Sequence, residues 1–204
     1  MQKIDIKNKD IINLLNNFSS WFEILDKSKI KISGKQDKKD YYTREEYFKT
    51  INQKNHIGFP EIAHGVDLAK SESTSIDLRD RIRKIDEEFN NILSAKHCAV
   101  KMYYPKDGYM GWHNNHNASG YNILFSYTKN GNGYFRYKDP ITLETVTMHD
   151  SPGWTGKVGY YGSLKEKDKL YWHCARAYED RLTLGFVIPN KNFWEMMIED
   201  IESK

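Results

Sequence analysis

Histidines set among asparagines are the residues in this sequence whose types and spacing best suit chemistry, in the segment WHNNHN that starts at Trp112. Residues two apart in a strand point to the same face, so His113 and Asn115 would project together from an extended chain. Another histidine, His173, lies far along the chain in YWHCA. Imidazole nitrogens and an amide oxygen can bind a metal ion, although an amide carries no charge. The pattern indicates a metal site with an amide where a carboxylate is usual; a polar turn is the plain alternative.

The segment RLTLGF adds a cation to this set. In a strand, Arg181 and Thr183 would share one face, and the apolar residues between and after them would pack on the other. A buried arginine needs a partner, and its rigid fork suits a carboxylate. Two distant histidines and this arginine together predict a metal ion with an acidic co-substrate.

The first half of the sequence predicts the helices that would support such a site. Apolar residues recur at spacings of three and four over 10–28, 43–53 and 75–95, which is typical of amphipathic helices. Thr43 and Ser75 are the expected N-caps of the second and third helices. A short closing helix is expected after Pro189.

The second half predicts strands. Eight short β-favouring segments follow one another, separated by glycine- and asparagine-containing turns: 97–104, 108–114, 121–127, 133–139, 144–150, 156–162, 169–175 and 181–188. This spacing is typical of a β-sandwich or jelly roll. We therefore expect an α+β fold in one domain, with a mainly helical part over 1–96, a jelly-roll core over 97–190 and a C-terminal helix over 191–204.

Over roughly residues 100–188 the chain resembles the iron(II)- and 2-oxoglutarate-dependent dioxygenases, in particular the prolyl-hydroxylase and AlkB-like branches. The segments that carry the resemblance are YYPKDGYMGWHNN, GYFRYKDP, GKVGYYGS and RLTLGF. The sequence around WHNNHNASG is also similar to that of small oxygenase-like proteins of marine bacteriophages. The family's fold is a double-stranded β-helix, a form of jelly roll, which agrees with the strand pattern.

The resemblance implies roles for particular residues. It implies three iron(II) ligands, namely His113, Asn115 and His173. It implies three contacts to the co-substrate 2-oxoglutarate, namely Tyr104, Arg181 and Thr183. Dioxygen would be the other reactant, and hydroxylation the default outcome. The departure from the family is Asn115, because the family normally has a carboxylate at this position.

Three interpretations of Asn115 follow. The site works with two histidines and an amide; or His116 turns in and makes a three-histidine site; or the chain is a catalytically silent ligand-binding protein that keeps the fold of an oxygenase. A purely structural jelly roll gives no reason for Tyr104, His113, His173 and Arg181 to occur in this order.

Composition limits the other classes of function. At 204 residues and a formal net charge of +3, the chain is long enough for one buried core and only mildly basic. The AlkB-like enzymes carry a second arginine where this chain has Val187, so nucleic acid ranks below a peptide side chain or a small molecule as substrate. Two cysteines are too few for a disulfide framework, and no apolar run is long enough for a signal peptide or a membrane span. We expect an unexported, cytoplasmic protein.

The remaining candidates are expected to be structural. Four histidines have no partner at metal spacing: His56, His64, His97 and His149. Trp112, Trp172 and Cys174 would point away from the ligand face and pack in a core. Arg176 lies outside the co-substrate motif, and a surface position is expected for it.

Overall fold

The computed structural model describes residues 1–37, 39–70 and 74–204 of the chain. In these residues four α-helices accompany two antiparallel sheets, in agreement with the expected α+β class. The helices are α1 (Lys9–Ile24), α2 (Glu45–Gln53), α3 (Ile76–Ile92) and α4 (Lys191–Glu202), with short 3-10 segments at Lys27–Lys29, Tyr41–Thr43 and Lys167–Lys169. None of the helices in these ranges has both the length and the hydropathy that crossing a membrane requires.

Three short strands precede the eight longer ones. The short strands are β1 (Gln2–Ile4), β2 (Ala63–His64) and β3 (Val66–Asp67). The others are β4 (His97–Tyr104), β5 (Tyr109–His113), β6 (Gly120–Thr128), β7 (Gly133–Lys138), β8 (Thr145–His149), β9 (Gly153–Tyr161), β10 (His173–Ala177) and β11 (Arg181–Ile188). The larger sheet has the order β1-β9-β6-β11-β4-β3, and the smaller has the order β2-β5-β10-β7-β8.

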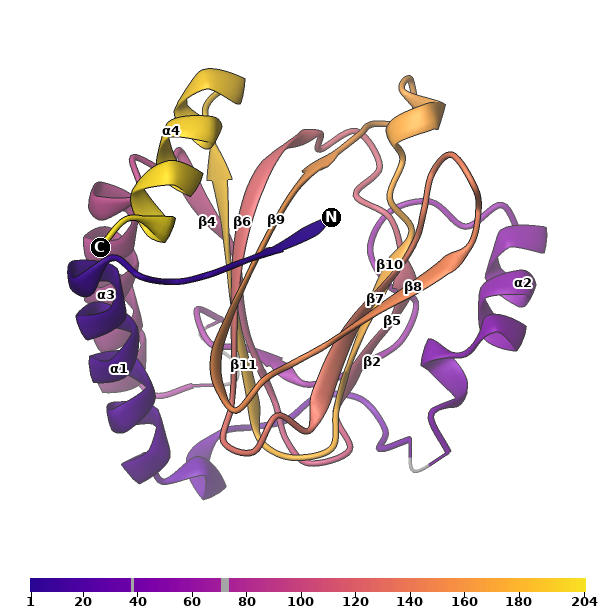
Figure 1. The fold of residues 1–204 in the computed structure, drawn as a ribbon. Helices are drawn as coiled ribbons and strands as arrows, with labels where there is room; N and C mark the ends of the chain where they lie inside the picture. The colour runs from indigo at the N-terminus through magenta and orange to yellow at the C-terminus, as the bar shows by residue number, and fades with distance from the viewer. Residues whose placement is uncertain (38, 71–73) are drawn as a thin grey trace.

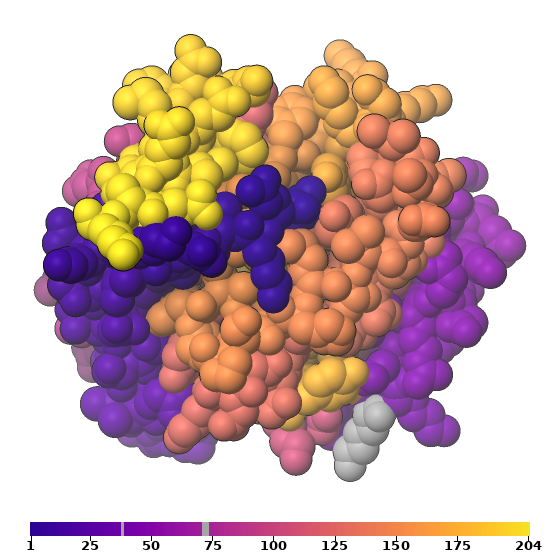
Figure 2. Space-filling model, in the orientation of Figure 1, coloured from indigo at the N-terminus to yellow at the C-terminus, as the bar shows by residue number. Residues whose placement is uncertain are grey.

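The two sheets face each other, and helices cover their outer faces (Figure 1). Helices α1, α3 and α4 lie on the outside of the larger sheet, whereas α2 lies on the outside of the smaller one. Figure 2 shows the N-terminal residues, in indigo, lying across the strands beside α4. There β1 pairs with β9 and covers an edge that would otherwise expose unpaired backbone groups.

The main apolar core lies between the larger sheet and its helices. Every second residue of β11 from Leu182 to Ile188 is buried in it together with the apolar stripes of α1 and α3. A smaller core under α2 contains Trp112 and Cys174. Both placements confirm the expected apolar faces. Because these strands bury apolar side chains outward against helices, their inward faces are available for polar residues.

All eight predicted strands are present, and the first and the last have the predicted bounds. The largest difference is in the seventh, which begins at His173 rather than at residue 169. A 3-10 turn occupies Lys167–Lys169, and the Gly162 N–H donates to the Lys169 carbonyl at 2.7 Å, so the chain there follows the end of β9 instead of joining the smaller sheet. The three short strands were not expected, since two or three residues give no periodic signal.

One of the two expected N-caps is correct. The Ser75 hydroxyl accepts a hydrogen bond from the Leu78 N–H and caps α3. The expectation for Thr43 is wrong, because α2 begins at Glu45 and its cap position has no side-chain hydrogen bond. The Thr43 hydroxyl donates instead to the Asp40 carbonyl. Thr43 belongs to the 3-10 segment Tyr41–Thr43, which ends before α2 begins, so its hydroxyl is not available to cap α2.

Candidate functional site

A cavity of about 960 Å³ lies between the two sheets. Its lining includes all six residues singled out from the sequence: Tyr104, His113, Asn115, His173, Arg181 and Thr183. They come from β4, β5, the segment after β5, β10 and β11, so residues far apart in sequence meet in one space. The structure shows where these residues lie; their roles remain predictions.

His113 and His173 are direct cross-strand neighbours in the β5–β10 pair. Their ring centroids are 4.1 Å apart with an interplanar angle of 53°. In each ring Nδ1 bonds to the backbone carbonyl two residues earlier, of Gly111 at 2.9 Å and of Tyr171 at 3.1 Å. A carbonyl only accepts, so Nδ1 carries the proton and Nε2 keeps the lone pair that a metal ion needs. Such carbonyl contacts orient metal-binding histidines in general.

The backbone of β5 explains why His113 faces the cavity. Trp112 is fully buried on the opposite face, where its indole N–H donates to the Arg44 carbonyl at 3.0 Å. The β5–β10 register shifts between His173 and Ala175, which is a bulge beside the histidine pair. Gly111 lies in this irregular stretch, and a Cβ there would be 2.9 Å from the Ile62 carbonyl oxygen. Glycine therefore allows the close backbone approach that sets the position of His113.

Both imidazoles are neutral near pH 7. Burial lowers the pKa of His113 to about 4. Burial, and then the neighbouring His113, lowers the pKa of His173 well below its usual range. A neutral imidazole is the form that binds a metal ion, so these pKa shifts leave both rings ready to act as ligands without first losing a proton.

Asn115 lies just beyond the end of β5 rather than within a strand, and it is half-buried at the cavity wall. The chain turns there because the Asn114 side-chain oxygen accepts from the His116 N–H at 2.9 Å. His116 is exposed and has a φ of 52°. Across residues 1–37, 39–70 and 74–204, no three His, Cys, Asp or Glu side chains are grouped to hold a metal ion. His116 also belongs to the cavity lining, so the three-histidine interpretation stays a prediction.

Arg181 is buried, with 1% of its surface exposed, and it makes several contacts on the inner face of the larger sheet. Its guanidinium donates to Ser126 Oγ at 3.0 Å and to Thr183 Oγ1. The guanidinium carbon lies 5.7 Å from the ring centroid of Tyr104. The Tyr104 hydroxyl donates to the sulfur of Met110, a weak acceptor, at 3.8 Å, and burial raises the pKa of Tyr104 to about 12. Tyr104 is therefore a neutral donor next to the cation.

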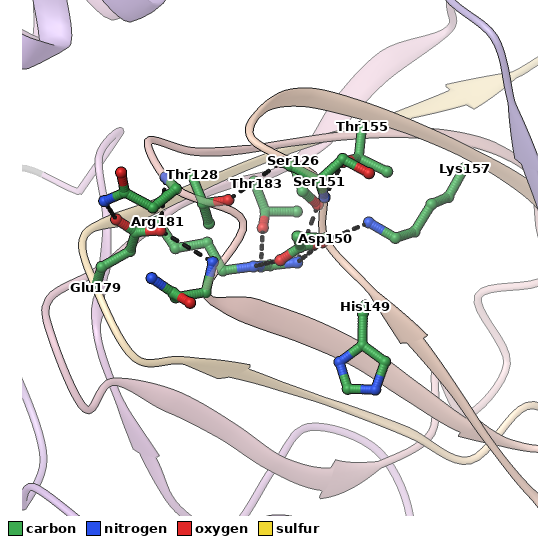
Figure 3. Close-up of polar contacts among 12 residues, drawn as sticks. Ser126, Thr128, His149, Asp150, Ser151, Thr155, Lys157, Glu179, Arg181 and Thr183 are labelled. Atoms are coloured by element: carbon green, nitrogen blue, oxygen red, sulfur yellow. Dashed lines mark hydrogen bonds and ion pairs between the residues drawn. The ribbon is translucent and has the colours of Figure 1, made fainter.

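Two charged residues that the sequence did not reveal complete this cluster. Asp150 follows β8, and its carboxylate accepts from Arg181 Nε at 2.7 Å and from Lys157 Nζ at 2.8 Å (Figure 3). Burial alone would raise the pKa of Asp150, but Arg181 and then Lys157 outweigh it and hold this pKa far below its usual range. The guanidinium of Arg181 was expected to bind the carboxylate of a ligand. In the structure it already contacts the carboxylate of Asp150. Lys157 had a signal in the sequence, because it is a charged residue inside the β-favouring run GKVGYYG.

Arg176 is buried rather than at the surface, so that expectation is wrong. Its guanidinium lies 2.7 Å from an Asp40 carboxylate oxygen and donates to the Asp107 carbonyl at 3.0 Å. These partners come from two loops, which sequence patterns do not place together. Arg176 thus ties loops to β10 and is absent from the cavity lining among the described residues.

The buried Lys157 makes stability depend on pH. Burial lowers its pKa from the ordinary 10.5 to about 8. Between these values the unfolded chain binds more protons than the folded one, so stability rises with pH, while below pH 8 the full cost of charging the buried amine is present. We expect the free energy of unfolding of the wild type, relative to Lys157→Met, to rise by about 2–3 kcal/mol between pH 7 and 10. Urea unfolding at several pH values measures this, and a difference independent of pH would contradict it.

The donor set fits iron(II) at two of three protein positions. Two neutral imidazoles from adjacent strands correspond to the nitrogen ligands of a two-histidine, one-carboxylate site. Asn115, predicted for the third position, would offer an amide oxygen, which has the right element but lacks the charge. The cations at the cavity wall suit an acidic co-substrate, which would bring negative charge to the same cavity.

Comparisons with known proteins add little. No family model matches the chain, and no curated protein matches it. Among solved structures, the chain is similar to a prolyl-4-hydroxylase from Pseudomonas putida, with 12% identity and a TM-score of 0.36, over 80% of this chain and 95% of that one. This likeness is too low to assign a function.

Proposed function

We propose that this protein is an iron(II)- and 2-oxoglutarate-dependent dioxygenase that hydroxylates a peptide side chain or a small molecule. The observation that carries the proposal is the histidine pair. His113 and His173 are buried, neutral and adjacent, and each is held by a backbone carbonyl so that Nε2 keeps its lone pair. A structural role alone gives no reason for two imidazoles to share this arrangement at a cavity with cations in its wall.

The order of the strands supports the same proposal. If β4 to β11 are numbered one to eight, the larger sheet reads six, three, eight, one and the smaller reads two, seven, four, five. This order supports a jelly roll, the fold expected from the resemblance to the double-stranded β-helix oxygenases. The ligand strands β5 and β10 are the second and seventh, which are neighbours in that order.

In this proposal each side chain has a defined task. His113, His173 and Asn115 would hold iron(II), and Arg181 with Thr183 would bind the far carboxylate of 2-oxoglutarate, beside the Tyr104 hydroxyl. Iron(II) would supply the oxidation of a C–H bond by dioxygen, with 2-oxoglutarate converted to succinate and carbon dioxide. Phe135 and Tyr161 pack against the His173 ring, at centroid distances of 5.6 and 5.1 Å, and would exclude water from that side.

The test is an anaerobic titration of the metal-free protein with iron(II) and 2-oxoglutarate. We expect the weak visible charge-transfer band of the chelate, followed by succinate when air is admitted. A band without succinate in the presence of candidate substrates would favour the silent ligand-binding protein. If no band forms at saturating concentrations, the metal assignment is wrong.

Asn115→Asp separates the working enzyme from other roles for this residue. A carboxylate adds a charged oxygen ligand, so we expect iron(II) to bind roughly tenfold more tightly or better, a change of ~1.4 kcal/mol. Competition with a metal-sensitive dye under anaerobic conditions measures this affinity. Asn117→Asp is the control, because it adds the same charge at an exposed position of the following turn. Equal affinities for the wild type and Asn115→Asp would show that residue 115 is no ligand.

A further inference from the structure

The cluster of Arg181, Asp150 and Lys157 contains two cations and one anion. Lys157 and Asp150 have fully buried side chains, and that of Arg181 is 1% exposed. Figure 3 shows both cations directed at the same carboxylate, whereas His149 points away from it. The cluster therefore carries a net charge of about +1 in the interior of the protein. A buried charge without a partner is costly, so buried charges are usually paired or bind a metal ion.

The cations, and not the anion, face the cavity. Lys157 and Arg181 are part of its lining, and Asp150 is not. Among the described lining residues, Asp67 is the one acidic side chain, and its carboxylate accepts from the Ala69 N–H at 3.0 Å in its own turn. Asp150 thus lies behind the two cations, and their unbalanced charge is directed at the cavity.

The strand pattern of β9 places Lys157 there. Val158 faces outward into the main core, whereas Lys157 and Tyr161 share the inner face. The neighbours of Lys157 across β9 are Leu124 on β6 and the exposed Lys3 on β1. Neither residue can neutralise the Lys157 amine. The fold therefore fixes the position of this amine, but only Asp150 balances its charge.

We propose that Lys157 is a second cation of the carboxylate-binding site, so that a ligand carboxylate binds between Lys157 and Arg181 while Asp150 holds both from behind. The cluster then has two cations and two carboxylates and is neutral when the site is filled. This inference rests on the proposed function only in taking the ligand to be 2-oxoglutarate. The site itself would accept other dicarboxylates of similar length.

The ionisation of Lys157 agrees with this role. Its amine is faced by Asp150, by Arg181 of β11 and by Lys3 of β1. Burial lowers its pKa to about 8, although Asp150 raises it, so the amine is charged at pH 7 and partly neutral at pH 8.5. A bound carboxylate favours the charged form, so ligand binding at pH 8.5 should be accompanied by uptake of a proton.

The experiment is calorimetric titration of the metal-free protein with glutarate, a dicarboxylate that lacks the keto group and so needs no metal. We expect Lys157→Met to weaken glutarate binding at least tenfold at pH 7. Lys138→Met is the matched control, because Lys138 is also a buried lysine, paired with Glu45 at 2.7 Å, but does not line the cavity. Equal affinity in Lys157→Met, or no binding of glutarate by the wild type, would overturn the inference.

A second measurement does not depend on folding of the variant. Titration of the wild type at pH 8.5 in two buffers of different ionisation enthalpy gives the number of protons taken up, and no uptake would overturn the role of Lys157. Failure of the proposed function is distinguishable from failure of this inference. Glutarate binding that depends on Lys157, without an iron chelate band, would reject the oxygenase and keep the carboxylate site.

Discussion

Asp150→Asn is expected to destabilise the protein by about 3–5 kcal/mol, because it leaves two buried cations without their anion. Asn has nearly the same size as Asp and keeps one hydrogen-bond acceptor. The loss of stability therefore measures the effect of the missing charge rather than that of a cavity. In the wild type this carboxylate contacts both Arg181 and Lys157 at less than 3 Å. For a chain of this length, such a loss lowers the melting temperature by roughly 6–20 °C.

Chemical denaturation of the wild type and the variant at pH 7, with the slope of the transition checked for equality, measures this loss. Asp168→Asn is the control, because it removes the same charge from an exposed residue. We expect a change within about 0.5 kcal/mol for this control. Equal stability of the Asp150→Asn protein and the wild type would mean that Asp150 is not the partner of the two cations in solution.

His173→Gln is expected to weaken iron(II) binding by roughly a hundredfold or more, since even loss of a residue that only orients a ligand costs 10–100-fold. Gln retains much of the volume, which matters because Phe135 and Tyr161 pack against the ring. Anaerobic titration with iron(II), followed by the charge-transfer band in the presence of 2-oxoglutarate, measures the effect.

His149→Gln provides the control for this experiment. His149 is exposed at the end of β8, and its ring points away from the cluster in Figure 3. Its replacement should leave iron binding unchanged, as the sequence pattern also predicts. Near-UV circular dichroism of both variants checks that aromatic packing is intact. The histidine assignment would fail if the two variants bound iron(II) with the same affinity as the wild type.

The sequence predicted those parts of the fold that depend on local alternation. The bounds of β4 and β11 match, and in β11 Arg181 and Thr183 alternate with apolar residues that pack on the helix-covered face. The α2 cap and the start of β10 were missed because short 3-10 turns precede both elements. The Thr43 hydroxyl bonds to the Asp40 carbonyl, and a turn at Lys167–Lys169 delays the strand.

The residues of the candidate site likewise fall into those that the local sequence indicates and those that it does not. Histidines and an arginine in strands carry a signal of their own, and the structure brings His113, His173 and Arg181 to one cavity. Asp150 follows the end of a strand in a short connecting segment, where a carboxylate is ordinarily solvated, so nothing local distinguishes it. Asp150 can be recognised as the partner of two cations only in the folded chain, where β9 and β11 bring Lys157 and Arg181 to the inner face of the larger sheet.

The register in which β5 pairs with β10 decides whether the two histidines come together. A slip of one residue along a β ladder turns every side chain to the opposite face, so a mispaired β5 would send its imidazole under α2 and leave its partner alone. The ring pair therefore exists only in the correctly aligned sheet. An ion bound by both rings would act as a removable cross-link between distant parts of the chain, adding stability to this alignment and to no other.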